Sequence, residues 1–145
     1  VICNADVVSK KRALELLADL LARKTEADKS FDIFQLLTER EKLGSTSLGH
    51  GIALPHARTD LCKQAIGVFI RTKKGIDFDS PDHEPTDLLF ALMVPEHYTD
   101  EHLNILAGLA GMFNDENFCQ NLRSADNDTE LFHRLTSRDV SSLAS

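Results

Sequence analysis

The sequence feature that most limits the fold is an apolar run near the middle of the chain. Residues 88–94 (LLFALMV) contain no polar side chain, Asp87 precedes them, and Pro95 ends the run. The run is far shorter than the roughly 20 residues that cross a bilayer. A continuously apolar strand is typical of a strand covered on both faces. We therefore predict a buried strand over residues 87–94, in a sheet with helices on both sides, and no membrane insertion.

Helical patterns lie before and after this run. Ser9 is the predicted N-cap of a first helix, and Ser30 is the predicted N-cap of a second helix that stops at Gly44. The first helix has its apolar residues three and four positions apart, at Ala13, Leu14, Leu16, Leu17, Leu20 and Leu21. After the run, helical signals predict helices over residues 101–113, 116–123 and 129–136.

Short stretches rich in β-branched and aromatic residues predict the remaining strands. They cover residues 52–54 and 64–71, with a turn at 72–75 and a brief edge strand at Ile76 and Phe78. The resulting order is a strand, two helices, a group of strands and then helices. This order fits an α/β fold, and the length fits a single domain over residues 1–145.

Charge and cysteine content limit the partners and the compartment. The formal net charge is −7 and the pI is about 5.3, whereas a nucleic-acid binder needs a basic face. The same acidity suits docking onto a basic protein surface, or is simply solvated. Cys3, Cys62 and Cys119 are odd in number and widely spaced, as expected of reduced thiols in a cytoplasmic protein. No charged-then-apolar leader opens the chain, and its start at Val1 suggests that an initiator and a short upstream segment are missing.

Several motifs of well-known sites are absent from the sequence. It contains no G-x-x-x-x-G-K-[ST], no G-x-G-x-x-G after a strand and no G-x-S-x-G. His50 and His56 are six residues apart across a proline, and His97 and His102 are five apart. Neither pair has the i, i+4 spacing of a helical zinc site. The sequence therefore predicts no metal site and no cofactor.

The segment GSTSLGHGIALPHAR, residues 44–58, is unusual because it combines glycines, hydroxyls and a histidine after a proline. Gly49 and Gly51 permit positive φ and let backbone N–H groups approach an anion. Ser45, Thr46 and Ser47 add hydroxyl donors. The pattern fits an anion site, and it also fits an ordinary turn.

His56 stands at the end of this segment on a rigid support. Pro55 fixes its own φ and pushes Leu54 towards an extended conformation. Arg40, near the end of the second helix, could supply a planar guanidinium for phosphate oxygens. A neutral imidazole with donors and an arginine nearby is what phosphoryl transfer to a histidine requires.

His102 is the second histidine of interest because it begins the helix after the buried strand. Ligands collect in the crevice outside strand ends of open sheets, so His102 could lie beside His56 and donate to a phosphoryl group. A solvent-facing histidine at a helix start is the alternative. We expect the other four histidines to be exposed: His50, His83, His97 and His133.

Two long segments carry a resemblance to a known family. Residues 38–58 (TEREKLGSTSLGHGIALPHAR) and 87–106 (DLLFALMVPEHYTDEHLNIL) resemble the fructose/mannitol-type enzyme IIA domains of the bacterial phosphotransferase system. Within these domains, the sequence is most similar to the free-standing nitrogen-regulatory type. The resemblance extends from about Ser9 to Thr136.

The resemblance implies a three-layer α/β/α sandwich with a mixed sheet of about five strands. It places the phosphorylated histidine of the family at His56, a second active-site histidine at His102 and the active-site arginine at Arg40. Ser45, Thr46 and Gly49 match the motif around the phosphoryl pocket. A leading helix of the family is expected to be absent here.

The resemblance also implies a function, with an alternative. The chain would be a phosphocarrier that accepts phosphate from an HPr-like phosphohistidine protein and regulates targets, such as a kinase or an ion-transport protein, by its phosphorylation state. The alternative is a sugar-specific enzyme IIA that passes phosphate to the IIB component of a fructose or mannitol permease. A third possibility is an interaction module whose binding is merely gated by phosphorylation. Phosphohistidine is already a high-energy donor, so the transfer needs no metal.

Overall fold

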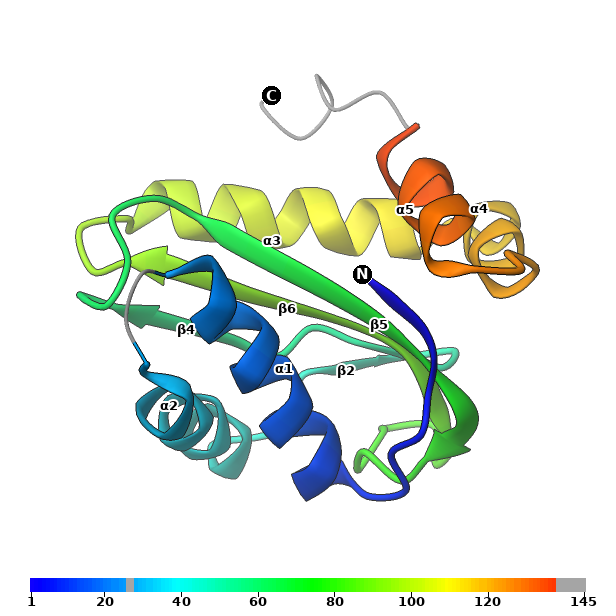
Figure 1. Ribbon diagram of the computed structural model, residues 1–145, viewed down its shortest axis with the longest axis horizontal. Coiled ribbons are helices and arrows are strands. Elements are labelled where there is room, and N and C mark those ends of the chain that lie inside the picture. Colours follow the sequence, from blue (N-terminus) through cyan, green and yellow to red (C-terminus); the bar gives the residue numbers. More distant parts are fainter. Residues whose placement is uncertain (26–27, 138–145) are drawn as a thin grey trace.

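The computed structural model describes residues 1–25 and 28–137 of the chain. Its apolar run forms β6 (Thr86–Pro95), in which every residue except Asp87 and Phe90 is buried. This confirms the predicted strand. β6 pairs with three other strands and lies in the middle of the sheet (Figure 1).

The sheet is mixed and has six strands, in the order β1-β5-β6-β3-β2, with β4 also paired to β6. β1 (Ile2–Ala5) runs parallel to β5 (Ile66–Ile76), and β5 runs antiparallel to β6. β3 (Ile52–Ala53) and β4 (His56–Thr59) both run parallel to β6, and β2 (Ser47–Gly49) forms a short hairpin with β3.

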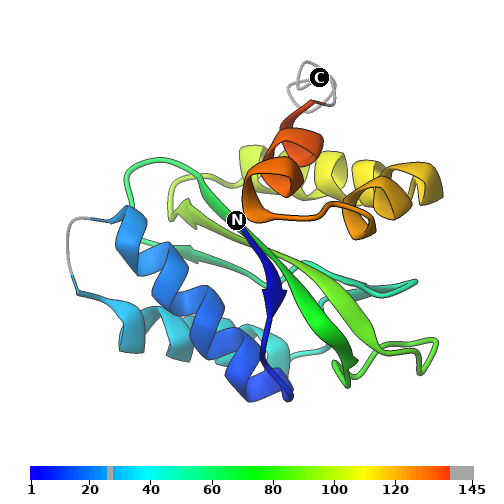
Figure 2. The same cartoon turned by 45° about the vertical axis from the view of Figure 1, so that its right-hand side comes forward.

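Helices cover both faces of the sheet, as Figures 1 and 2 show. α1 (Lys10–Lys24) and α2 (Ser30–Lys42) lie on one face. α3 (Asp100–Phe113), α4 (Glu116–Arg123) and α5 (Asp128–Thr136) lie on the other. The predicted α/β sandwich is therefore confirmed, with six strands in place of about five.

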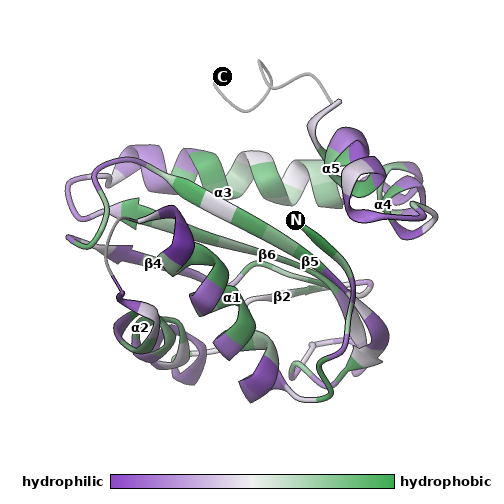
Figure 3. Ribbon diagram, viewed as in Figure 1, coloured by the Kyte–Doolittle hydropathy of each residue, from purple (hydrophilic) through white to green (hydrophobic). Residues whose placement is uncertain are grey.

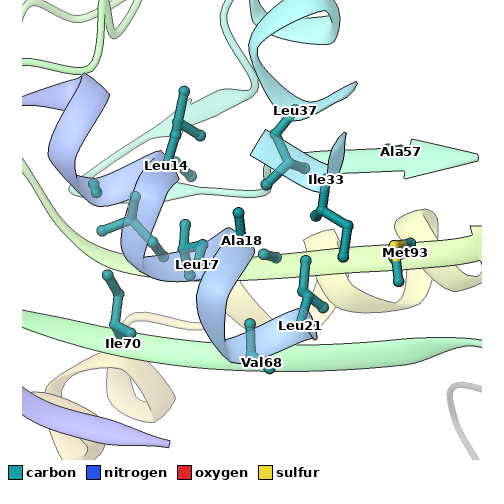
Figure 4. Packing of buried hydrophobic residues seen from close by; sticks show 14 of the residues in the cluster. Leu14, Leu17, Ala18, Leu21, Ile33, Leu37, Ala57, Val68, Ile70 and Met93 are labelled. Atoms are coloured by element: carbon teal, nitrogen blue, oxygen red, sulfur yellow. The ribbon is translucent and has the colours of Figure 1, made fainter. Parts of the chain in front are cut away.

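The alternation of side chains along β5 and β6 divides the core into two halves. Leu89, Ala91 and Met93 of β6 face α1 and α2, whereas Leu88 and Leu92 face the C-terminal helices. Figure 4 shows leucines of α1 and α2 packed over Val68, Ile70 and Met93. Figure 3 shows the apolar residues concentrated along the middle of β5 and β6.

Two details of the predicted helix starts had different outcomes. Ser9 is the N-cap of α1, because its hydroxyl accepts a hydrogen bond from the Arg12 N–H at 3.2 Å. The prediction for Ser30 was wrong: α2 begins at Ser30, and its N-cap Lys29 makes no side-chain cap bond. The Ser30 hydroxyl instead donates to the Asp19 carboxylate, which ties α2 to α1.

The predicted turn at residues 72–75 and the separate edge strand were also wrong, because β5 continues to Ile76. Its pairing with β6 shifts register between Arg71 and Ile76, which absorbs the irregularity. Gly75 lets β5 approach the segment before β6 closely, since a Cβ at position 75 would lie 2.5 Å from Pro85 Cβ. The glycine thus marks a close contact within a strand.

Candidate functional site

His56 is held by the strand that carries it and by a backbone carbonyl. β3 and β4 follow β6 in register, with Ile52 opposite Leu88 and His56 opposite Leu92. Pro55 bridges the two strands, and its carbonyl accepts a hydrogen bond from the Leu92 N–H at 2.9 Å. The expected extended support for His56 is thus a second short strand beside β6.

The hydrogen bonds of His56 define its tautomer. Nδ1 lies 2.8 Å from the Leu54 carbonyl oxygen. Because a carbonyl only accepts, Nδ1 carries the proton and Nε2 carries the lone pair of the neutral ring. Arg40 Nε donates to that Nε2 at 3.3 Å. One imidazole nitrogen therefore faces a cation, while the other is fixed by the backbone.

Arg40 is oriented by the chain that follows its own helix. Its Nη1 donates to the Gly44 carbonyl at 2.9 Å, and the Gly44 N–H donates back to the Glu41 carbonyl at 3.1 Å. Gly44 has a φ of 150°, in the region that favours glycine. The end of α2 thus folds back so that the guanidinium can reach His56.

His102 lies beside His56, as the sequence predicted. The two ring centroids are 5.4 Å apart and the ring planes meet at 71°, an edge-on arrangement. His102 is in the first turn of α3, and its Nε2 is buried without a hydrogen-bond partner in the part of the chain that the structure describes. The alternative of a solvent-facing histidine is therefore not what the structure shows.

Both imidazoles are biased towards their neutral forms. Burial lowers the pKa of His56, and the nearby Arg40 cation lowers it further, against the opposing effects of the Leu54 carbonyl and Glu41. Burial also lowers the pKa of His102, with added effects of His56 and Arg58. Near neutral pH the site therefore contains an uncharged imidazole whose Nε2 lone pair accepts a hydrogen bond from an arginine.

Ser45 and Thr46 direct their polar groups to protein partners. The Ser45 hydroxyl donates to the Phe78 carbonyl at 2.7 Å and accepts from the Ser47 N–H at 3.1 Å. Thr46 is buried, and both its N–H and its hydroxyl donate to the Glu41 carboxylate. Their roles in phosphoryl binding stay predictions, and in this structure they shape the loop.

Gly49 is not brought beside His56. It pairs with Ile52, which lies opposite Leu88 of β6. His56 lies opposite Leu92, four residues further along β6, so Ile52 and His56 are about 13 Å apart along the strand direction. The Gly49 N–H donates to the Ser47 hydroxyl at 3.3 Å. Its positive φ serves the turn between β2 and β3.

The remaining histidines lie where the sequence predicted them. His50, His83, His97 and His133 are all exposed. Within residues 1–25 and 28–137, no three histidine, cysteine, aspartate or glutamate side chains cluster as metal ligands would. None of the helices in these ranges is both long and apolar enough to cross a membrane.

Sequence reasoning missed one residue next to the site, Glu41. It is only 8% exposed and pairs with Lys10. A signal for it was present, because Ile33, Leu37 and Glu41 follow one another at intervals of four along the buried side of α2. A carboxylate on an apolar helix stripe indicates a buried partner.

Comparison with known proteins gives a consistent family. The model of the family described as phosphoenolpyruvate-dependent sugar phosphotransferase system, EIIA 2, matches residues 1–138. A nitrogen regulatory protein of Pseudomonas aeruginosa is 44% identical over 124 residues, which cover 86% of this chain and 80% of the relative. One of Klebsiella oxytoca is 41% identical over 129 residues, covering 88% and 79%.

A solved structure agrees with both the sequence likeness and the fold. The crystal structure of the nitrogen regulatory protein IIA-Ntr from Neisseria meningitidis is similar to this chain with a TM-score of 0.86 and 43% identity. The similarity covers 92% of this chain and 91% of the other.

Proposed function

The chain belongs to the EIIA 2 family of the phosphoenolpyruvate-dependent sugar phosphotransferase system, and on this premise we propose that it is a phosphocarrier of the nitrogen-related branch. It accepts a phosphoryl group on Nε2 of His56 from an HPr-like phosphohistidine protein. The observation that carries the proposal is the tautomer of His56: the Leu54 carbonyl accepts a hydrogen bond from Nδ1–H, so Nε2 is the nucleophilic nitrogen. Relatives that are 41–44% identical and named nitrogen regulatory proteins support the branch.

The transfer follows from this geometry. The Nε2 lone pair attacks the phosphorus of a donor phosphohistidine whose other ring nitrogen is protonated. The P–N bond of the donor breaks, and the donor leaves as a neutral imidazole with that electron pair. Arg40 turns from Nε2 to the phosphoryl oxygens, where its fork of N–H donors offsets their charge. The phosphorylated ring of His56 keeps its Nδ1 proton, and the Leu54 carbonyl stabilises the positive charge of that ring.

Two further groups stand ready for the transferred phosphoryl group. His102 presents a ring edge to His56 and has an unpartnered Nε2 among the described residues. Arg58 shares the strand face of His56, because residues two apart on β4 point to the same side. We propose that His102 hydrogen-bonds the phosphoryl group and that Arg58 adds positive charge at the rim of the site.

Partners meet this site from outside, and two exposed leucines adjoin it. Leu43 is 84% exposed and precedes Gly44, whose carbonyl binds Arg40. Leu103 is 66% exposed and follows His102. Phosphorylation adds close to two negative charges at His56, enough to change the affinity for a regulated kinase or an ion-transport protein.

The proposal is tested by incubating the protein with a phosphorylated HPr-like carrier and mapping the label. We expect one label, on Nε2 of His56, and none in His56→Gln. His50→Gln is the matched control, because His50 is an exposed histidine in the same glycine-rich segment and should leave labelling unchanged. Labelling of the His56→Gln variant, or of Nδ1, would contradict the proposal.

The same labelled protein separates the regulatory branch from the sugar branch. We expect the phosphoryl group to stay on His56 or return to the carrier when a IIB component of a fructose or mannitol permease is added. Rapid onward transfer to that component would assign the chain to sugar transport. Equal capture of a target protein by the phosphorylated and unphosphorylated forms would contradict regulation by phosphorylation.

A further inference from the structure

A buried carboxylate lies directly behind the proposed phosphorylation site. Glu41 follows Arg40 in α2 and is only 8% exposed. Its carboxylate accepts the Thr46 N–H at 3.2 and 3.3 Å and also accepts the Thr46 hydroxyl. The Lys10 ammonium lies 2.9 Å from it, in an ion pair between α1 and α2.

One branch of contacts leads from Thr46 to the protonated nitrogen of His56. The Thr46 carbonyl accepts a hydrogen bond from the Leu54 N–H at 3.1 Å. The Leu54 carbonyl then accepts the Nδ1 proton of His56. The position of Thr46 therefore fixes the residue that selects the tautomer.

A second branch leads to the free nitrogen. The Glu41 backbone carbonyl accepts the Gly44 N–H, and the Gly44 carbonyl accepts from Arg40 Nη1. Arg40 Nε then reaches His56 Nε2. Residues 41–46 thus form a loop that the bonds from Thr46 to the Glu41 carboxylate close. This loop positions the Leu54 carbonyl and Arg40, which are the partners of the two imidazole nitrogens of His56.

Lys10 is the counter-ion of this carboxylate and holds it in place. An unpaired buried carboxylate would be strongly disfavoured, and the ion pair removes most of that cost. Lys10 also pairs with Asp79 at 3.0 Å and lies 4.7 Å from the centre of the Phe78 ring. The loop is therefore anchored to α1 and to the segment after β5.

We propose that Glu41 is a positioning residue for phosphoryl transfer at His56, acting through Thr46 and Gly44. The proposal rests on the proposed function for its kinetic consequence. Its structural consequence, a single fixed tautomer of His56, is independent of that function. Phosphoryl transfer depends on placement, and a displacement of about 1 Å can cost about a hundredfold in rate.

The test compares Glu41→Gln with Glu39→Gln, an exposed glutamate two residues earlier on the same helix. In Glu41→Gln we expect ¹⁵N NMR to show a mixture of the two neutral His56 tautomers, whereas wild type and Glu39→Gln show the Nδ1–H form. We expect kcat for phosphoryl uptake from the phosphorylated carrier to fall at least about tenfold with KM unchanged. Glu39→Gln should match the wild type in both measurements.

A second variant keeps the proposal testable if Glu41→Gln does not fold. Lys10→Met leaves the carboxylate in place but removes its cation, and should shift the tautomer and kcat in the same direction. A merely structural role predicts lower thermal stability with an unchanged tautomer and kcat in the folded protein, and that result would overturn the proposal. A wild type that takes up no phosphoryl group would refute the proposed function alone, because the tautomer is measured without a donor.

Discussion

The proposed phosphoryl transfer to His56 sets two requirements that oppose each other. A nucleophilic imidazole must be neutral, yet its phosphorylated product carries charge that needs donors nearby. The structure places Arg40 on the nucleophilic nitrogen, where its cation disfavours protonation before transfer, and a carbonyl on the other nitrogen, where it stabilises the charged ring afterwards. The same two contacts therefore serve both states of the ring.

The first prediction concerns the pH dependence of uptake. Burial and then Arg40 lower the pKa of His56 below the usual value of 6.5, so the neutral ring persists at pH values where a free histidine is already protonated. We expect the uptake rate to hold as the pH falls through 6.5 and to decline only as it passes the lowered pKa. In Arg40→Met the midpoint should move to higher pH, because a cation that disfavours protonation is gone.

The measurement is a pH–rate profile of phosphoryl uptake at saturating donor, paired with NMR titration of His56. Arg40→Met should also lower the plateau rate by about a hundredfold, as removal of a donor to developing charge does in other enzymes. An unchanged midpoint in Arg40→Met would show that the guanidinium does not act on the resting imidazole.

At the scale of elements, the glycine-rich turn between β2 and β3 is held by side chains from elsewhere in the chain. The His50 N–H donates to Asp82 at 2.8 Å, and the His50 carbonyl accepts from Arg123, which also pairs with Asp87 at 2.9 Å. Hydrogen bonds from Ser80 and from backbone N–H groups lower the pKa of Asp82 to about 2, so it stays ionised as an anchor. The turn is thus tied to α4 and to the start of β6.

The second prediction compares two glycine substitutions that we expect to change the free energy of unfolding in opposite directions. Gly51 has a φ of 82°, and a Cβ there would lie 2.6 Å from Arg123 Nη2 and 2.7 Å from Asp87 Oδ1. We expect Gly51→Ala to lower the free energy of unfolding by about 2 kcal/mol or more, from backbone strain and disruption of the ion pair. Gly111→Ala should raise it by about 0.5–1 kcal/mol, since Gly111 is helical with open space around its Cα.

Denaturant unfolding of the two variants beside the wild type gives both values. Equal stability of Gly51→Ala and the wild type would mean that the positive φ and the Arg123–Asp87 pair contribute nothing to holding the turn.

The elements that the sequence predicted well are those whose signal is local and long. The apolar run predicted the position of β6 and the amphipathic spacing predicted that of α1, because burial determines which residue types occur along these two elements. β4 was not predicted, since its strand character comes from pairing with β6 over only four residues. The continuation of β5 past Gly75 was missed for a related reason: the glycine is there for Pro85, a residue ten positions away.

The candidate site shows the same division. A proline before His56 and the motif around it drew attention to the histidine. Arg40 and His102 were proposed from their places near the end of the second helix and at the start of the helix after the buried strand, and the family resemblance then assigned their roles. The Leu54 carbonyl was not predicted, because its role depends on how the loop folds back on α2. The Glu41 carboxylate was overlooked although its place on the buried side of α2 was a signal. Gly49 was grouped with the site because it matches the family motif around the phosphoryl pocket, whereas the strand register places it away from His56.

For the whole molecule, the central fact is that three separate elements meet at one place. The end of α2 brings Arg40, β4 brings His56 and the start of α3 brings His102, and the sheet separates α2 from α3 (Figures 1 and 2). The core on each face of the sheet therefore fixes one wall of the site. The exposed Leu43 lies at the end of α2 and the exposed Leu103 in the first turn of α3, and we propose that a donor protein that reaches His56 contacts both.

The last prediction tests this docking. Removing an exposed leucine that a partner buries should weaken binding and leave the chemistry intact, so Leu43→Ser and Leu103→Ser should each raise KM for the phosphorylated carrier by about tenfold with little change in kcat. Phosphoramidate, a small donor that needs no docking surface, should phosphorylate His56 in these variants at the wild-type rate. Phe132→Ser is the control, because Phe132 is 54% exposed on α5, at the other end of the molecule from α2. A raised KM in the control as well, or slower reaction of the leucine variants with phosphoramidate, would place the effect in folding or in the site itself and not in docking.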